Sequence, residues 1–377
     1  MTTPTSLTAA EFFAGIGLVR MGMQSAGIDV VYANDIELTK QEMYAQQFGA
    51  DASEHFELRD IGKVAGSELP RVDLAWASFP CTDLSLAGNR KGLEGVQSGT
   101  FWHFTRILRE MGDERPAVVA LENVVGFATS HGGADLVAAI QELNDLGYSV
   151  DVLTLDARRF VPQSRPRLFL VGALEAPEDV ADEGSELRPD WLQIPYGDPN
   201  LRMHRANIPA PPAPLTSGLK DVVQKQGVEW WDFERSTRFM DSLSPFQAER
   251  LDVLRRSKTV SYRTAYRRTR NGVAVWEVRS DDIAGCLRTA RGGSSKQAVV
   301  RAGNGKVSVR WMTPLEYARL MGAGDYDING IRANQVLFGF GDAVCVPVVS
   351  WLAESYLVPL AKGQLAASAD DRALKVV

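Results

Sequence analysis

The cysteine at position 81 is the residue in this sequence best placed to do chemistry. Cys81 lies in the stretch SFPCTDLSLAG, directly after a proline and after the apolar run VDLAWASF. Pro80 disfavours helical geometry at Phe79, so the run is predicted to be a strand that ends in a loop at Cys81. A lone cysteine is more often an inert buried side chain than a nucleophile. Cys81 is therefore either a packing residue or a nucleophile at a strand end.

A carboxyl group follows the next apolar run along the chain. The run AVVALENV brings Glu122 and Asn123 to its end. In doubly wound sheets the strands end at one edge, where ligands bind, so Cys81 and Glu122 are expected to face one pocket. A thiol and an acid suit nucleophilic addition to an electron-poor ring, with the acid protonating or hydrogen-bonding the ring. The alternative for Glu122 is a helix-capping acid.

Two arginines, Arg165 and Arg167, come just before another apolar run, in PQSRPRLFLVG. In extended chain, residues two apart point to one face, and guanidinium groups suit carboxylate or phosphate. We expect the pair to orient Glu122 or to hold a backbone phosphate. Two surface arginines without a role are the alternative.

A glycine-rich turn near the start of the chain has the pattern of a nucleoside-binding loop. FFAGIG precedes apolar residues at helical spacing, and Asp35, at the end of the next apolar run, lies twenty positions after Gly15. Such an acid accepts hydrogen bonds from ribose hydroxyls. Arg20 occupies the position of the third glycine of the dinucleotide pattern, which favours a smaller cofactor without a pyrophosphate, such as S-adenosylmethionine.

Over the first 172 residues, short apolar runs typical of strands alternate with segments of helix length. Helix-length segments separate six apolar runs, which are AAEFFA, DVVYANDI, VDLAWASF, AVVALENV, YSVDVLTLD and RLFLVGAL. This alternation predicts an α/β fold with a mostly parallel, Rossmann-like sheet. Near the C-terminus, Thr313, Pro314 and Glu316 predict the start of a helix, and the following apolar stretch predicts a turn and a long buried helix.

The amino-acid composition changes after residue 174, which suggests that the chain is divided into three parts. We expect a catalytic and cofactor-binding core over 1–174, a smaller domain of irregular structure over 175–285, and a return to the core over 286–377 that ends in a tail. Residues 255–310 contain fourteen Lys or Arg against three acids, although the whole chain carries a net charge of −6. A basic segment on an acidic body is typical of a local contact with a polyanion. A solvated charged face is the alternative.

The overall composition argues against metal-binding, disulfide-rich and membrane-spanning classes of protein. The three cysteines are far apart and accompany only four histidines, so neither a metal site nor a disulfide framework is expected. No signal sequence and no run of roughly 20 apolar residues is apparent, so we expect a cytoplasmic protein that does not span a membrane.

Seven sequence blocks in order resemble those of the DNA (cytosine-5) methyltransferases of bacterial type. The blocks are FAGIG, NDIE, FPC, ENV, QSRPR, RWMTPLEYARLMG and FGDAV. The resemblance covers residues 10–172 and about 286–356, and it implies a Rossmann-like methyltransferase core with a target recognition domain over 175–285. It also implies S-adenosyl-L-methionine as cofactor, double-stranded DNA as partner and extrusion of the target base from the duplex.

The resemblance assigns roles residue by residue. Cys81 is the nucleophile that adds to C6 of cytosine, Glu122 engages N3 and the amino group, Arg165 holds the ring carbonyl and Arg167 supports the site. The cofactor would be bound by Phe13, Ala14, Gly15, Gly17, Asp35, Ile36, Asp60, Ile61, Pro80, Asp342 and Ala343. Substrate contacts are expected from Ser85, Asn123, Arg263, Arg267, Arg268 and Arg288.

Five positions depart from the family's usual pattern. They are Leu18 for a glycine, Asp35 for a glutamate, Ile36 for an aromatic residue, Thr82 for a glutamine and Asp342 for an asparagine. None removes a catalytic atom, but the shape of the cofactor pocket and the loop at Thr82 are affected. Asp342 would attract the ammonium group of the cofactor or cap the next helix.

The leading hypothesis is a monomeric DNA cytosine-5 methyltransferase of a restriction-modification or related defence system, with a cognate defence protein as a further partner. Three alternatives stay open. The chain could methylate tRNA by the same chemistry, it could be a catalytically silent DNA-binding regulator, or it could be an NAD-dependent oxidoreductase.

Overall fold

The computed structural model describes residues 6–80, 93, 99–181, 184–270, 272–289 and 296–365. Contacts divide the chain into two compact units. Unit 1 comprises residues 1–155, 166–211 and 348–377, and unit 2 comprises 156–165 and 212–347. Each unit is therefore built from segments that are distant in the sequence.

Unit 1 contains a seven-stranded sheet in the order β3-β2-β1-β4-β5-β7-β6. The strands are β1 (Leu7–Phe12), β2 (Ile28–Asp35), β3 (Phe56–Leu58), β4 (Leu74–Ala77), β5 (Val118–Val124), β6 (Ser149–Asp156) and β7 (Pro166–Ala173). The pairs β1/β2, β1/β4, β2/β3 and β4/β5 are parallel, and β5/β7 is antiparallel. The predicted α/β core is confirmed, and all six apolar runs are strands. The three-residue β3 is too short to give a sequence signal.

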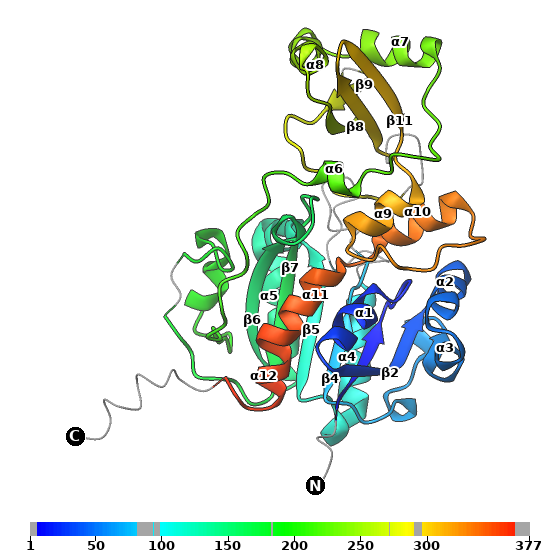
Figure 1. Ribbon diagram of the computed structural model, residues 1–377. Coiled ribbons are helices and arrows are strands. Elements are labelled where there is room, and N and C mark those ends of the chain that lie inside the picture. Colours follow the sequence, from blue (N-terminus) through cyan, green and yellow to red (C-terminus); the bar gives the residue numbers. More distant parts are fainter. Residues whose placement is uncertain are drawn as a thin grey trace. The chain divides into compact units, whose positions relative to one another are not determined.

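Strand register aligns apolar side chains into one layer of the core. Ala10 pairs with Ala75 and Ala75 with Val119, so these side chains share a face of the sheet. That face packs with residues of α4 (Thr100–Met111) and α5 (Ala134–Asp145) in one buried cluster. In Figure 1, α1 (Leu18–Ser25) lies over the opposite face. The helices α2 (Leu38–Phe48) and α3 (Ala50–His55) pack beside β2 and β3.

The C-terminal part of unit 1 is helical and buried. It comprises the end of α11 (Val346–Leu352), a π-helical turn over Ala353–Leu357 and α12 (Val358–Ala361). Among the described residues, the run Ala333–Ala361 has the length and apolar composition of a membrane span, but two thirds of its most apolar window is buried inside the protein. That burial is typical of a core helix. The prediction of a turn followed by a long buried helix fits this region, with breaks that the sequence did not indicate.

Unit 2 contains a four-stranded antiparallel sheet in the order β11-β10-β8-β9. Its strands are β8 (Ser261–Arg270), β9 (Val273–Val278), β10 (Ala298–Gly303) and β11 (Lys306–Trp311). Its helices are α6 (Leu219–Val222), α7 (Phe233–Asp241), α8 (Pro245–Arg256), α9 (Pro314–Leu320) and α10 (Ala333–Asp342). The predicted capping box at the start of α9 is present, with Thr313 and Glu316 as its partners. Regular structure over 233–278 thus replaces much of the irregular domain that we expected.

One face of this sheet carries a core of its own. Ala265, Ala298 and Val300 face α7 and α8 in a buried cluster with Phe239 and Leu251. The strand residues in between, among them Tyr266 and Arg268, lie on the opposite face. Helices α7 and α8 therefore cover one face of this sheet, whereas the opposite face carries exposed side chains such as Arg268 and buried ones such as Val299.

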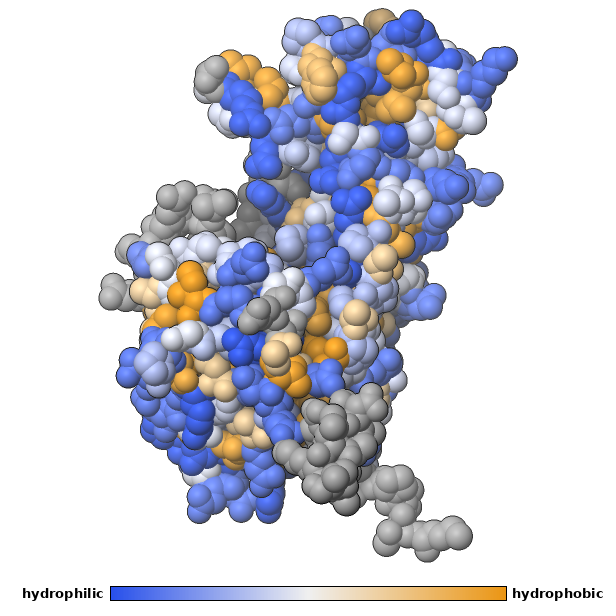
Figure 2. Space-filling model, turned by 90° about the vertical axis from the view of Figure 1, so that its left-hand side faces the viewer, coloured by the Kyte–Doolittle hydropathy of each residue, from blue (hydrophilic) through white to orange (hydrophobic). Residues whose placement is uncertain are grey.

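The compact units differ from the predicted parts at both ends of the middle region. Residues 175–211 cluster with unit 1, whereas 286–347 cluster with unit 2. The first difference has a clear cause, because Arg188 is buried against Asp151 of β6. Hydrophilic residues dominate the surface in Figure 2, with smaller apolar patches among them.

Candidate active site

The site is built where β4 and β5 end side by side. Ala77 pairs with Leu121, so the residues after Ala77 leave the sheet next to Glu122. The buried Asn123 amide donates to the Phe79 carbonyl at 3.1 Å, and its oxygen accepts from the Val124 amide at 2.8 Å. This contact fixes the segment that leads to Cys81. Cys81, Thr82 and Ser85 themselves lie outside the described residues.

Asn123 has a different environment from the one expected of a substrate contact. Both polar atoms of its side chain already bond within the protein. Its position explains why an amide is suitable there, because it links the two strand ends on which Cys81 and Glu122 depend. We therefore assign Asn123 to positioning the loop.

Glu122 forms an ion pair with Arg167 across two antiparallel strands. Glu122 pairs with Phe169 in the sheet, and Arg167, two residues earlier on β7, is its diagonal neighbour on the same face. Arg167 Nε lies 2.8 Å from Glu122 Oε1, and the side chains are only 14% and 10% exposed. The capping role that was the alternative for Glu122 has no support in this geometry.

Arg165 bonds to several main-chain carbonyls within unit 2. Its side chain donates to the carbonyl oxygens of Leu287 at 2.8 Å, Gly341 at 3.2 Å and Ala343 at 2.7 Å. The extended geometry expected of both arginines begins only at Pro166, where β7 starts, and the Arg165 amide bonds to Asp156. Arg167 thus pairs with Glu122, whereas Arg165 ties separate parts of unit 2 together.

The turn after β1 has the backbone of a nucleoside-binding loop. Phe13, Gly15 and Gly17 all have positive φ, at 58°, 58° and 81°. The Gly15 amide donates to Asp35 Oδ2 at 2.9 Å, and the Glu37 amide donates to Asp35 Oδ1 at 2.9 Å. Each carboxylate oxygen keeps a second lone pair, so ribose hydroxyls can still bond to Asp35.

The two glycines of this turn differ in the space that a side chain would find there. A Cβ at Gly17 would meet Phe48 at 2.4 Å and Tyr44 at 2.8 Å, so packing excludes any side chain. A Cβ at Gly15 would meet nothing closer than 4.0 Å, so the space beside Gly15 is open. That open space next to Asp35 fits a bound nucleoside.

The remaining expected cofactor residues fall into two groups. In unit 1, Ile36 is 65% exposed beside Asp35, Ile61 is buried, and the Asp60 carboxylate accepts from the Gly62 amide at 2.9 Å. Ile36 thus presents an exposed apolar side chain beside Asp35. In unit 2, Asp342 accepts from the Thr289 hydroxyl at 2.6 Å and Ala343 binds Arg165.

Glu11, buried on β1, is a residue that the sequence reasoning missed. Neither of its carboxylate oxygens has a hydrogen-bond partner among the described residues. Burial raises its pKa to about 8, although the nearby Arg20 opposes this rise. The acid within AAEFFA, in the middle of an otherwise apolar run, was the available signal.

The arginines expected to contact DNA have unequal environments in unit 2. Arg263 lies 3.8 Å from Asp282 and is only 15% exposed, so it is poorly placed to reach a ligand. Arg267, Arg268 and Arg288 are exposed. Arg267 and Arg268 point to opposite faces of the sheet, since Arg267 pairs with Trp276 and Arg268 with Val275.

Among the described residues, no group of three or more His, Cys, Asp or Glu side chains could hold a metal ion. The arrangement at the β4/β5 edge is that of an acid held by a guanidinium group, next to the segment that carries a thiol. These groups suit acid-assisted addition to a ring.

Comparison with known proteins gives both family and fold. The family model described as C-5 cytosine-specific DNA methylase matches residues 7–357. The chain is 33% identical over 168 residues to the Type II methyltransferase M.HhaI of Haemophilus parahaemolyticus, which is 44% of this chain and 49% of that protein. It is 34% identical over 165 residues to M.MspI of Moraxella sp, which is 44% of this chain and 38% of that protein. The chain thus spans about half or less of the length of these relatives.

Two solved structures share the fold over nearly the whole chain. The Entamoeba histolytica methyltransferase EhMeth matches with a TM-score of 0.59 and 14% identity, covering 96% of this chain and 99% of that one. The S. pombe Dnmt2 methyltransferase matches with a TM-score of 0.56 and 17% identity, covering 94% and 99%.

Proposed function

Because the chain belongs to the C-5 cytosine-specific DNA methylase family, we propose that it methylates C5 of cytosine in DNA with S-adenosyl-L-methionine as methyl donor. The observation that carries the proposal is the Glu122–Arg167 pair beside the anchored segment that leads to Cys81. Without an acid and a nucleophile at one sheet edge, the family's chemistry could not be assigned to this chain.

The proposed reaction starts with addition of the Cys81 thiolate to C6 of an extruded cytosine. The C5–C6 π electrons move toward C5, while the Glu122 carboxyl group hydrogen-bonds N3 and the amino group and balances the charge that develops there. Once bound, S-adenosyl-L-methionine would supply an electrophilic methyl group to C5, and the electron pair of the broken S–CH3 bond would stay on its sulfur. Loss of the C5 proton and of the Cys81 thiolate then restores the aromatic ring and frees the enzyme.

The contacts favour an exchange of the roles that the resemblance gave to the two arginines. Arg167 holds Glu122 and lies next to the place where the ring would bind, so it is the better candidate to hold the ring carbonyl. Arg165 donates hydrogen bonds to three main-chain carbonyls, which suits a structural role.

The residues of unit 1 fit the cofactor as this family uses it. Asp35 would hold the ribose, Ile36 would cover the adenine and Asp60 with Ile61 would reach the adenine edge. Pro80 and the turn from Phe13 to Gly17 would complete the site in unit 1. This assignment rests on the open space at Gly15 and on the lone pairs that Asp35 retains.

We further propose that the substrate is double-stranded DNA and that the methylation belongs to a restriction-modification or related defence system. Relatives named as type II methyltransferases support this context. A cytoplasmic, monomeric enzyme and a cognate defence protein complete the proposal. The basic face of unit 2 is the candidate for contact with DNA, with Arg268 and Arg288 as its exposed members.

The decisive experiment compares Cys81→Ala with Cys345→Ala. Host DNA is sequenced for 5-methylcytosine after expression of each variant, and labelled methyl transfer to duplex DNA and to tRNA is measured in vitro. We expect Cys81→Ala to abolish transfer while retaining cofactor binding. Cys345, buried outside the site, should leave transfer intact when replaced.

An active Cys81→Ala enzyme would refute the proposed nucleophile. Preferential transfer to tRNA would refute the DNA substrate. If the unmodified protein left no 5-methylcytosine in DNA and bound DNA without transfer, a silent regulator would be the better description.

A further inference from the structure

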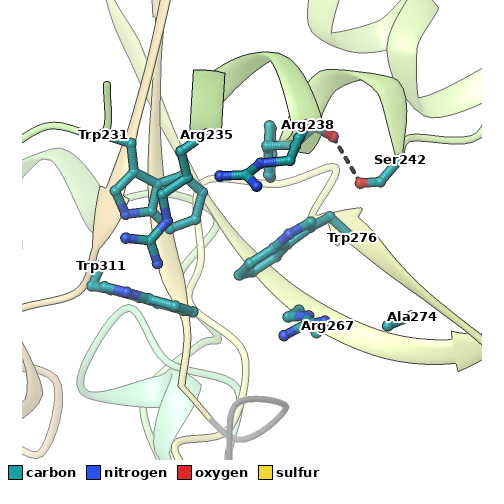
Figure 3. Close-up of a pocket in the computed structure, with 9 residues that line it drawn as sticks. Trp231, Arg235, Arg238, Ser242, Arg267, Ala274, Trp276 and Trp311 are labelled. Atoms are coloured by element: carbon teal, nitrogen blue, oxygen red, sulfur yellow. Dashed lines mark hydrogen bonds between the residues drawn. The ribbon is translucent and has the colours of Figure 1, made fainter. Parts of the chain in front are cut away.

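We propose that a tryptophan–arginine pocket within unit 2 binds a nucleotide whose base is not stacked in a duplex. Of the lining residues, Arg267 is one of the arginines expected to contact DNA, and the others have no role in the candidate active site. The pocket has a volume of about 370 Å³, which lies within the usual range of small-molecule sites. It is lined by Trp231, Arg235, Arg238, Phe239, Ser242, Arg267, Ala274, Trp276 and Trp311 (Figure 3).

The pocket is formed on the helix-covered face of the four-stranded sheet. Strand register puts Arg267 of β8 directly opposite Trp276 of β9 on that face. Trp311 ends β11, and the Trp231 amide bonds to the Val309 carbonyl at 2.8 Å beside that strand. Helix α7, which starts at the Asp232 cap, then brings Arg235 and Arg238 over the sheet. Regular elements therefore hold most of the lining.

Three of the chain's eight tryptophans meet in this pocket. The ring centroids of Trp231, Trp276 and Trp311 are 5.2–5.6 Å apart in pairs, with tilted or edge-on geometry. The rings touch one another, so a ligand has to contact the free faces that border the cavity. All three indoles stay partly exposed. Base–aromatic stacking on such faces is the usual way to bind an unpaired base.

Arginines supply the charge of the pocket, and no acid is among its lining residues. Arg235 lies between the rings of Trp231 and Trp311, 4.2 and 5.2 Å from their centroids, as Figure 3 shows. Arg238 is 3.5 Å from the highly exposed Glu234, a contact that contributes little. Arg267 forms no ion pair among the described residues. The pocket therefore selects against cationic ligands and favours anions.

On the opposite face of the same sheet, by contrast, an acid accompanies two of the arginines. Arg270 forms an ion pair with Glu277 at 2.6 Å, and Arg268 lies 3.8 Å from the same acid. The pocket thus combines three arginines with indole faces and has no acid in its lining. A ligand that combines a planar aromatic ring with phosphate satisfies both features, and a nucleotide is such a ligand.

A base inside a duplex has no free face, so the nucleotide has to be unpaired or free in solution. An ordinary hydrophobic core would explain the three indoles but not three arginines around them. A phosphate-only site would explain the arginines but not the indoles. The combination of both is what points to a nucleotide.

The test uses the full-length protein and its tryptophan fluorescence. Titrations with dAMP, an eight-nucleotide poly-dA strand, a blunt duplex and inorganic pyrophosphate are compared. We expect saturable quenching with dAMP or the single strand and much weaker binding of duplex and pyrophosphate. Response to dAMP identifies a free nucleotide as the source, whereas response to the strand alone identifies an unpaired nucleotide in DNA.

Variants locate the site. Arg267→Ala combined with Arg238→Ala should weaken binding at least tenfold, and Trp276→Phe should weaken it several-fold. Arg301→Ala is the matched control, because Arg301 is an exposed arginine of β10 whose strand neighbour Val300 faces the core. It should bind like the unmodified protein.

Equal binding by all variants, or pyrophosphate binding as tight as dAMP, would overturn the proposal. Duplex binding as tight as single-strand binding, with the same loss on Arg267→Ala, would assign the arginines to a duplex backbone instead. Methyl transfer by the same samples is measured separately, so failure of the proposed methylation would not be mistaken for failure of this site.

Discussion

At the scale of single residues, the buried carboxyl group of Glu11 has the clearest consequence for stability. Its folded pKa is about 8, mainly because burial disfavours the charged form, whereas an unfolded glutamate titrates near 4.5. Between these values the folded chain binds more protons than the unfolded chain. The free energy of unfolding is therefore lowered as the pH rises through this window.

We expect Glu11→Gln to remove this pH dependence. In the unmodified protein, ionisation of Glu11 lowers the free energy of unfolding by up to about 1.4 kcal/mol for each unit by which the pH rises between pH 4.5 and pH 8. Urea unfolding at pH 5.5 and at pH 8 measures the slope for both proteins. Identical slopes would mean that Glu11 is ionised or paired in the folded protein.

Substitutions of the two arginines in the QSRPR block should have different effects, one on turnover and the other on stability. Arg167→Lys keeps a charge near Glu122 but loses the guanidinium fork, so we expect the turnover number to fall at least tenfold with little change in melting temperature. Arg165→Lys loses the planar guanidinium group that reaches three separate carbonyls at once, and it should cost about 2 kcal/mol of stability. Methyl-transfer kinetics and thermal melts separate the two effects. Loss of turnover without loss of stability in Arg165→Lys would restore the role that the resemblance first implied.

At the scale of elements, the segment over 188–206 is attached to β6 by a buried polar network. Arg188 donates to both oxygens of Asp151 at 2.8 and 2.6 Å, and the hydroxyl groups of Tyr196 and Tyr356 donate to the same carboxylate. Burial alone would raise the pKa of Asp151, but Arg188 lowers it overall. The carboxylate is therefore charged and compensated.

Replacing Arg188 with Met should be strongly destabilising. It leaves the Asp151 carboxylate buried without its cation, which costs about 3–5 kcal/mol. The control is Arg71→Met, because Arg71 pairs with Glu114 at the surface and such pairs contribute about 0–1 kcal/mol. Urea unfolding compares the two variants. Equal stabilities would show that the network is dispensable.

Sequence patterns predicted elements better than they predicted long-range partners. The six apolar runs and the capping box at Thr313 were sufficient to find β1, β2, β4–β7 and α9, because these signals are local. They could not indicate that Asn123 bonds to Phe79 or that Arg165 turns away from Glu122, because both depend on where neighbouring strands begin and end. Cys81, the residue with which the chemistry starts, stays a prediction.

At the scale of the whole molecule, the compact units explain why domain limits were hard to predict. A change in composition at residue 174 suggested a boundary, but Arg188, His204 and Tyr356 all contact β6 or one another within unit 1. Composition describes the surface that a segment presents to water. It does not describe which carboxylate the segment compensates.

A fragment ending at residue 174 should therefore not fold stably. It contains Asp151 but lacks Arg188, Tyr196 and Tyr356, so a buried carboxylate would lose its cation and two hydrogen-bond donors. A fragment of residues 1–211 joined by a flexible linker to 348–365 keeps all of them. We expect a cooperative thermal transition for the longer fragment and none for the shorter one, measured by circular dichroism. Cooperative unfolding of 1–174 alone would mean that the boundary suggested by composition, and not the one formed by these contacts, limits the folding unit.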